Sequence, residues 1–112
     1  MINLAAGKCV SCRAGEPTLT DDEIQDLLLH VHQWEVKEVN GMKRLEKSFK
    51  FKNFAQALEF TNKIGVIAEE EGHHPLLITE WGRVTVQFWT HKIGGLHKND
   101  FIMAAKTDEL YG

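Results

Sequence analysis

The chain has 112 residues, of which 43% are hydrophobic, and a formal net charge of −3 at pH 7. This length suits one domain, and three Trp with six Phe argue against intrinsic disorder. A pI near 6.0 lacks the basic excess typical of nucleic-acid-binding domains. No apolar run approaches the roughly 20 residues of a membrane helix, and the N-terminus lacks the pattern of a secretory signal. We therefore expect a cytoplasmic protein that binds neither nucleic acid nor membrane.

The N-terminal stretch, residues 1–17, is predicted to be a flexible tail before a single domain at 18–112, because it is rich in small residues and glycine and ends near Pro17. Cys9 and Cys12 are the only cysteines and form one CxxC motif in this tail. A zinc ribbon needs a second pair, and a redox CxxC normally lies between a strand and a helix. We expect reduced, solvated thiols, with a metal shared between the cysteines and histidines as the alternative.

The first helix is predicted to begin at Thr20, whose hydroxyl forms a capping box with Glu23. Its apolar stripe is expected to end near residues 30–32 and contains Ile24, Leu27, Leu28 and Val31.

A hairpin is predicted next, with strands at 34–39 and 42–51, because Asn40-Gly41 supplies the positive φ values of a tight turn. Lys47 interrupts the apolar face of the second strand, so part of that strand is expected to lie at a sheet edge.

The longest helix is predicted to begin after Asn53 and to stop at Gly72. Gly65 inside it costs about 1 kcal/mol relative to Ala, which indicates either close backbone packing or a neutral surface position.

Two more strands are predicted at 76–80 and 83–91, joined by a turn at Trp81-Gly82, and a last helix at 98–110. The resulting order, α-β-β-α-β-β-α, predicts an α+β fold in which three helices pack on one face of a four-stranded antiparallel sheet. Because the other face and the edges stay open, we expect a homo-oligomer, either a dimer or a tetramer.

Three histidines are expected to converge at one end of this sheet. Residues 73 and 74 precede one strand of a hairpin, His91 ends the other, and Asp100 begins the next helix beside them. Histidine changes charge near neutral pH, and a neighbouring carboxylate fixes its tautomer, so the group is suited to acid–base chemistry. Trp81 or Trp89 could provide a flat surface for a ring-shaped ligand.

A metal site built from two or three histidines is the main competing interpretation. Adjacent histidines on an extended chain point to opposite faces, so His73 and His74 are poorly placed to share one metal with His91. His30, His32 and His97 are interpreted as surface histidines.

The spacing of Glu69, His73-His74-Pro75, Trp81, His91 and Asp100 resembles the motif of the pterin-4a-carbinolamine dehydratase family. The resemblance extends over residues 20–109, and the CxxC tail is similar to that of bacterial members. The chain differs at His97, where family members often have Thr, and imidazole is a poorer helix cap than a hydroxyl.

The resemblance implies a dehydratase that converts 4a-hydroxytetrahydropterin to quinonoid dihydropterin without metal or organic cofactor. By analogy, His73 and His91 are the acid–base candidates and Asp100 orients or polarises a histidine. His74 chiefly holds the pterin, while Glu69, Trp81 and Pro75 belong to the same substrate-binding motif.

The resemblance also implies partners and rival functions. An aromatic amino acid hydroxylase would supply the substrate, and some family members are dimerisation cofactors of a transcription factor. A role in the molybdenum cofactor pathway and a small metalloprotein are further alternatives.

Overall fold

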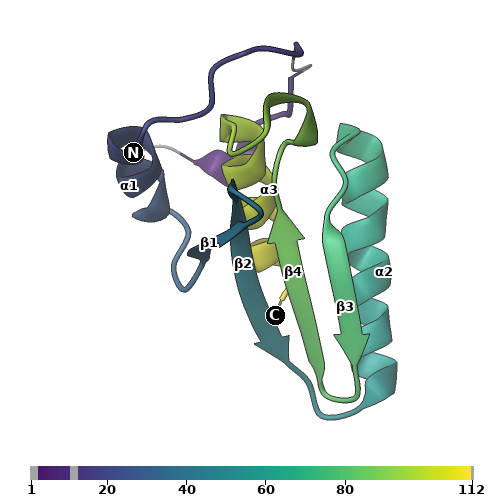
Figure 1. The fold of residues 1–112 in the computed structure, drawn as a ribbon. Helices are drawn as coiled ribbons and strands as arrows, with labels where there is room; N and C mark the ends of the chain where they lie inside the picture. The colour runs from purple at the N-terminus through teal and green to yellow at the C-terminus, as the bar shows by residue number, and fades with distance from the viewer. Residues whose placement is uncertain (1–2, 11–12, 112) are drawn as a thin grey trace.

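The three α-helices and four strands follow one another in the order that the sequence predicts. The computed structural model describes residues 3–10 and 13–111. Its elements are η1 (Leu4–Ala6), α1 (Asp21–Leu28), β1 (Glu35–Val39), β2 (Met42–Lys50), α2 (Phe54–Glu71), β3 (Leu76–Glu80), β4 (Arg83–Phe88), η2 (His91–Ile93) and α3 (Lys98–Leu110). The strands form one antiparallel sheet in the order β1-β2-β4-β3. With α2 and α3 against one face (Figure 1), the predicted α+β fold is confirmed.

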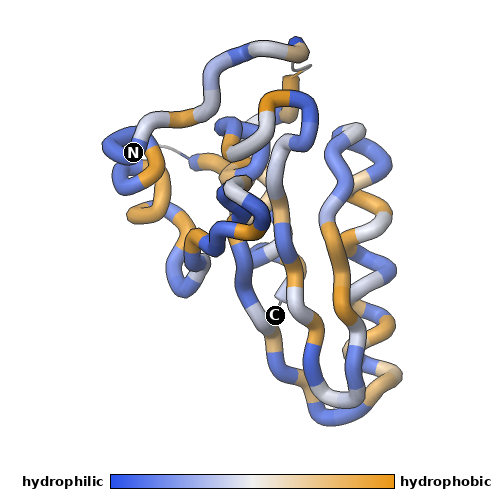
Figure 2. Tube along the Cα trace, in the orientation of Figure 1, coloured by the Kyte–Doolittle hydropathy of each residue, from blue (hydrophilic) through white to orange (hydrophobic). Residues whose placement is uncertain are grey.

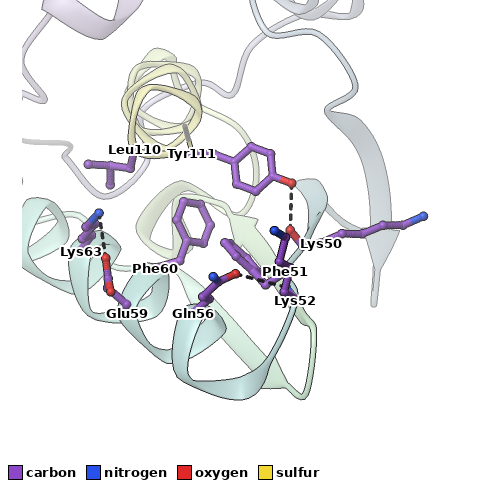
Figure 3. A pocket seen from close by; sticks show the side chains of 9 residues that line it. All are labelled: Lys50, Phe51, Lys52, Gln56, Glu59, Phe60, Lys63, Leu110 and Tyr111. Carbon is purple, nitrogen blue, oxygen red and sulfur yellow. Dashed lines mark hydrogen bonds and ion pairs between the residues drawn. The ribbon is translucent and has the colours of Figure 1, made fainter.

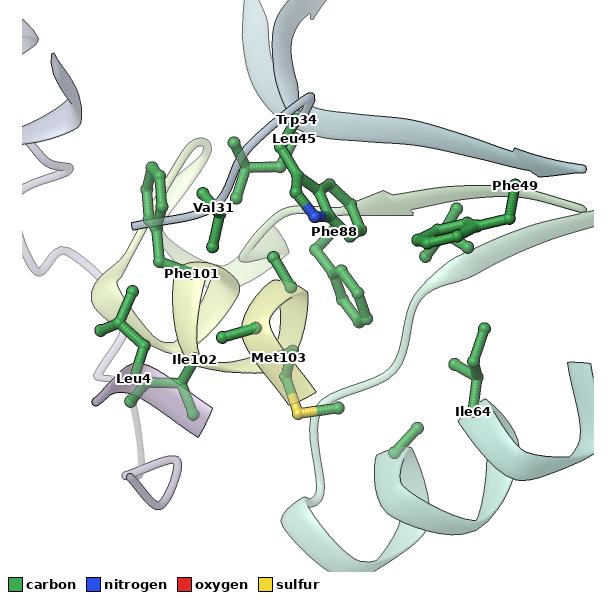
Figure 4. Packing of buried hydrophobic residues seen from close by; sticks show 14 of the residues in the cluster. Leu4, Val31, Trp34, Leu45, Phe49, Ile64, Phe88, Phe101, Ile102 and Met103 are labelled. Carbon is green, nitrogen blue, oxygen red and sulfur yellow. The ribbon is translucent and has the colours of Figure 1, made fainter. Parts of the chain in front are cut away.

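Alternation along the strands directs one set of side chains into a shared core. Leu45 and Phe49 of β2 and Phe88 of β4 are at most 2% exposed. Figure 4 shows these side chains meeting Ile64 of α2 and Phe101 of α3. Alternate residues on a strand point to opposite faces, so the other sheet face carries the polar side chains of β2 and β4.

The capping box at the start of α1 is confirmed. Thr20 Oγ1 accepts from Glu23 N at 3.2 Å, and Glu23 Oε1 accepts from Thr20 N at 2.8 Å. The helix ends at Leu28, earlier than expected, because the following amides bond three residues back rather than four. Val31 still reaches the core from this turn and is 1% exposed.

The Asn-Gly hairpin is also confirmed, with φ of 53° at Asn40 and 77° at Gly41. β1 pairs with β2 only as far as Glu46, so the strand from Lys47 onward has β4 on one side and an edge on the other, as expected. Lys47 is accommodated on the apolar face by Asp108, whose Oδ1 lies 2.7 Å from its Nζ.

The strand predicted to reach His91 ends at Phe88 instead. Thr90 forms an isolated bridge with Gly95, and the intervening residues 91–93 make the short helix η2. The chain folds back here because Gly94 has a φ of 73°. His91 therefore projects from a tight turn rather than from a sheet strand.

The N-terminal stretch contacts α3, where the sequence predicted a free tail. Leu4 is 4% exposed and joins the core, and Lys106 Nζ donates to the Ala5 carbonyl at 2.8 Å. Cys12 lies outside the described residues. The boundary at residue 17 and the flexibility of the tail remain predictions.

Hydropathy along the chain shows where apolar residues remain at the surface. The edge strand β3 carries an apolar run that is orange in Figure 2. Leu76 and Ile78 of this run are 40% and 46% exposed, whereas Leu77 between them packs against the core. None of the helices in residues 3–10 and 13–111 is long and apolar enough to cross a membrane.

Candidate functional site

His73 is positioned by the end of α2. Gly72 ends the helix in the left-handed conformation, with φ of 64°, and the His73 amide bonds back to the Ala68 carbonyl at 3.1 Å. A left-handed residue at this position redirects the chain sharply, which favours glycine. The His73 ring then stacks on Phe88, with 6.2 Å between the centroids and 16° between the planes.

Asp100 holds His73 from behind. Its Oδ1 lies 2.6 Å from His73 Nε2, and its Oδ2 accepts from Thr90 Oγ1 and His97 N, each at 2.9 Å. The Asp100 side chain is 0% exposed and that of His73 is 12% exposed. A carboxylate that already accepts two hydrogen bonds favours the tautomer with the proton on Nε2. Nδ1 is then the His73 nitrogen that can exchange a proton elsewhere.

His97 contributes to this arrangement as the N-cap of α3. Its Nδ1 accepts from Asn99 N at 3.0 Å, and Asp100 completes the capping box. The interpretation of His97 as a surface histidine was wrong, because its side chain is only 15% exposed and serves as this cap.

His74 faces a different partner from His73, as the extended backbone predicts. Its Nε2 lies 2.7 Å from Glu69 Oε2, and the two side chains are 62% and 78% exposed. An exposed pair of this kind adds little to stability. It places the His74 ring beside Glu69 at the rim of the pocket.

The three histidines line one pocket of about 470 Å³. Its described lining residues are Cys9, Val10, Glu71, Gly72, His73, His74, Trp89, Thr90, His91, Lys92 and Asn99. Asp100 does not line the pocket itself but contacts it through its bond to His73. The three imidazoles expected to converge therefore line the same pocket, with that of His73 partly buried and those of His74 and His91 exposed.

Trp81 lies away from this pocket. It sits in the β3–β4 turn, at the opposite end of the hairpin from His73 (Figure 1), and is 74% exposed. A strand rises about 3.3 Å per residue, so β3 separates the two positions by more than the width of a small ligand. Trp89 lines the pocket instead, with the Arg44 guanidinium 3.9 Å from its ring centroid. Pro75 is half-buried and does not line it, so the substrate contacts of Trp81 and Pro75 remain predictions.

Several lining residues were not anticipated from the sequence. Cys9 and Val10 belong to the stretch predicted as a flexible tail, where the sequence links Cys9 to histidines only through the alternative of a shared metal. Glu71 is the last residue of α2. Asn99 carried a weak signal, since it is a polar residue beside Asp100 in the first turn of α3.

A larger hollow of about 680 Å³ lies elsewhere, between the end of β2, α2 and the C-terminal turn (Figure 3). Its described lining has three lysines and one glutamate but no histidine; the residues are Lys50, Phe51, Lys52, Gln56, Glu59, Phe60, Lys63, Leu110 and Tyr111. Proton transfer near neutral pH is better served by the smaller histidine pocket. Within the described part of the chain, no group of three His, Cys, Asp or Glu side chains is arranged to hold a metal ion.

The sequence matches a known family over most of its length. A family model described as "Pterin 4 alpha carbinolamine dehydratase" matches residues 17–110. A Marinobacter nauticus protein named "Putative pterin-4-alpha-carbinolamine dehydratase" is 57% identical over 111 residues, which cover 99% of this chain and 100% of the relative. A Nitrosococcus oceani protein of the same name is 56% identical over 98% of this chain and 97% of its own.

Two solved structures share the fold. A transcriptional coactivator/pterin dehydratase from Brucella melitensis has a TM-score of 0.76 and 33% identity, covering 85% of this chain and 99% of its own. A pterin dehydratase-like protein identified as a RuBisCO assembly factor in the alpha-carboxysome has a TM-score of 0.62 and 26% identity, covering 74% and 94%.

Proposed function

The chain belongs to the pterin 4 alpha carbinolamine dehydratase family, and we propose that it is an active hydro-lyase. Its substrate is a 4a-hydroxytetrahydropterin, and its products are quinonoid dihydropterin and water. The observation that carries this proposal is the contact of His73 with the buried Asp100, at 2.6 Å, in the pocket that His74 and His91 also line.

The reaction needs one acid and one base. The C4a–O bond breaks as the departing hydroxyl takes a proton and leaves as water. N5 loses its proton to the base, and the electron pair from that N–H bond forms the C4a=N5 double bond. His73 and His91 are assigned as the acid–base pair, and together such groups supply roughly 10²–10⁴-fold acceleration.

The remaining motif residues have supporting roles in this proposal. Asp100 fixes the orientation and tautomer of His73 through its 2.6 Å bond. His74, held by Glu69, binds the edge of the pterin at the rim. The reaction requires no metal or organic cofactor.

The test is the rate of carbinolamine dehydration, with the substrate generated in place by a pterin-dependent aromatic amino acid hydroxylase. His73→Ala and His91→Ala should each lower kcat by roughly 10²-fold or more. His32→Ala is the matched control, because His32 is exposed and lies outside the pocket. Unchanged kcat in both site variants would contradict the acid–base assignment, and wild-type protein that gives no acceleration would reject the dehydratase.

A binding role is the second candidate, and the names of the two structural neighbours favour it. One is a transcriptional coactivator/pterin dehydratase, and the other is a RuBisCO assembly factor. An inactive but folded wild-type protein would favour such a role, with the hydroxylase as the first partner to test. An active enzyme whose substrate is not produced by a hydroxylase would point to another cytoplasmic pterin pathway, including that of the molybdenum cofactor.

A further inference from the structure

We infer that residues Cys9 and Val10 form one wall of the substrate pocket and that Val10 contacts the pterin ring. This inference rests on the proposed function. These residues precede the range of the family model, which begins at residue 17. They line the same pocket as the three histidines.

The wall is fixed by the side chain of Asn99. Val10 N donates to Asn99 Oδ1 at 3.0 Å, and Asn99 Nδ2 donates to the Val10 carbonyl at 2.7 Å. The amide thus satisfies both backbone groups of one residue, as a neighbouring strand would. Asn99 is 2% exposed, so breaking these bonds would leave a buried amide with fewer partners.

Cys9 adds two contacts on the other side of the wall. Its backbone N–H donates to Glu71 Oε1 at 2.8 Å, and its thiol lies 3.8 Å from the Asn99 carbonyl. Glu71 is the last residue of α2. The wall therefore bridges the end of α2 and the start of α3, the same two elements that bring His73 to Asp100.

The N-terminal stretch is anchored upstream of the wall as well. Leu4 is buried in the core, and Gly7 packs so closely that an added Cβ would lie 3.3 Å from Ile102 Cδ1. These contacts limit how far the segment can move from α3. Val10 is thus held directly by the buried Asn99, and the segment before it is held by the buried Leu4.

Val10 has the properties expected of a ring contact. Val10 lines the pocket and is 64% exposed, and it is the only aliphatic residue in the described lining. Flat heterocycles bind with apolar groups against their faces and polar groups at their edges. The histidines and Lys92 offer polar edges, whereas Val10 and Trp89 offer apolar surface.

Asn99 is accordingly a positioning residue, one position before Asp100 in the first turn of α3. One helical turn therefore holds both the wall and the acid–base histidine. The expected kinetic signature differs between the two neighbours, because the wall acts on binding and Asp100 acts on the chemical step.

The test is Val10→Asp, with Leu29→Asp as the matched control. Leu29 is a 72% exposed aliphatic residue outside the pocket. Val10→Asp should raise KM about ten-fold by removing an apolar contact, and a direct binding measurement separates this loss of affinity from any effect of the new carboxylate on the imidazoles. Calorimetric affinity for 7,8-dihydrobiopterin, a stable pterin, should fall by a similar factor. Leu29→Asp should change neither.

Asn99→Ser provides a second, independent variant. It should raise KM in the same direction, and the double variant Val10→Asp/Asn99→Ser should show much less than the product of the two effects, because both changes remove one wall. Circular dichroism confirms folding before each assay. Additive effects would overturn the link between Asn99 and Val10.

A KM and a dihydrobiopterin affinity of Val10→Asp within two-fold of wild type would overturn the wall while leaving the dehydratase intact. Wild-type protein that binds dihydrobiopterin without dehydrating the carbinolamine would reject the proposed function, and the affinity of Val10→Asp would still decide the wall. Wild-type protein that neither binds nor dehydrates would overturn both.

Discussion

At the scale of single residues, Asp100 is the side chain that links the fold to the chemistry. It is buried and accepts from a backbone amide, a hydroxyl and an imidazole. Such a residue has two separable consequences, one for folding stability and one for the orientation of His73. Its substitution therefore has to be measured in both ways.

Asp100→Asn should destabilise the protein by about 1–3 kcal/mol, because the new amide places an N–H against groups that themselves donate. It should also lower kcat by roughly 10²-fold or more by disturbing His73. Urea unfolding and the dehydration assay measure the two effects. Thr90→Val, which removes only the hydroxyl donor, should cost about 1 kcal/mol and leave kcat nearly unchanged. Equal kcat losses in the two variants would contradict the role assigned to the His73 contact.

Lys47 shows why an isolated sequence position can mislead. It interrupts an apolar face, yet its ammonium bonds Asp108, which also accepts from Trp34 Nε1 at 3.1 Å. The carboxylate lies 61 residues away in sequence. Hydropathy of the strand alone predicts the interruption but not the partner that compensates for it.

Asp108→Ala should therefore cost about 1–3 kcal/mol, since it leaves both the Lys47 ammonium and the Trp34 N–H without this acceptor. Lys47→Met keeps the aliphatic stem and removes the charge, so it should change the free energy of unfolding by less than about 1 kcal/mol. Urea denaturation of the two variants compares them directly. A Lys47→Met variant that loses as much stability as Asp108→Ala would mean that the ion pair itself stabilises the fold.

At the scale of elements, α2 has one glycine inside it and another directly after its last residue, and we expect opposite effects from substituting the two. Gly65 is helical, with no atom within 4 Å of an added Cβ, so the close packing considered from the sequence is absent there. Gly72 also has space, but its φ is 64°.

Gly65→Ala should stabilise the protein by about 0.5–1 kcal/mol by its higher helix propensity. Gly72→Ala should destabilise it by about 1–2 kcal/mol, because the left-handed conformation is unfavourable for alanine. Thermal unfolding of both variants gives the comparison. The same sign of change in the two variants would contradict the assignment of Gly72 as the helix stop.

An ion pair between α1 and β2 gives a prediction of how stability depends on pH. Lys43 hydrogen-bonds Asp21 at 2.6 Å and lowers the pKa of that carboxyl below its ordinary value of 3.8. The stabilising effect of the ion pair is therefore fully present above pH 3.8 and is lost as the pH falls through the lowered pKa of Asp21. The Tm difference between wild type and Lys43→Gln should be small at pH 6 and should vanish in stronger acid. A difference that grows on acidification would contradict this sign.

Elements governed by local rules were predictable from the sequence. The Thr20 capping box, the Asn40-Gly41 turn and the Gly72 stop each depend on residues within a few positions. The site was predictable where hairpin geometry brings its ends together, as with His73. The short helix η2 depends on a local reversal at Gly94, within a strand pattern that continues to His91 in the sequence. The wall at Val10 depends on a contact 89 residues away, which no local pattern encodes.

At the scale of the whole molecule, the exposed edge of β3 bears on the predicted homo-oligomer. Leu76 and Ile78 are exposed on a strand with only one neighbour in the sheet. If two copies pair antiparallel about Ile78, the middle residue of β3, Trp81 of the second copy falls opposite Pro75, beside His74. That pairing would reconcile the substrate role predicted for Trp81 with its distance from the pocket.

Sedimentation velocity should then give a mass above 12.8 kDa, that of one chain. Ile78→Lys should shift the protein toward the monomer, because like charges would face each other across the two-fold. It should also weaken dihydrobiopterin binding, as Trp81→Ala would. A wild-type monomer with full activity would contradict the pairing and return Trp81 to a surface position.

The Val10–Asn99 contact also has a consequence for the order of folding. It joins positions 89 residues apart, so the loop it closes spans most of the chain. The contact forms only after this loop has closed and α3 is in place, so it is expected to form late in folding. α3 also supplies Phe101 and Met103 to the core, and both residues are 0% exposed. The core and the wall at Val10 are therefore completed by the same helix, and neither is finished before α3 packs on the sheet.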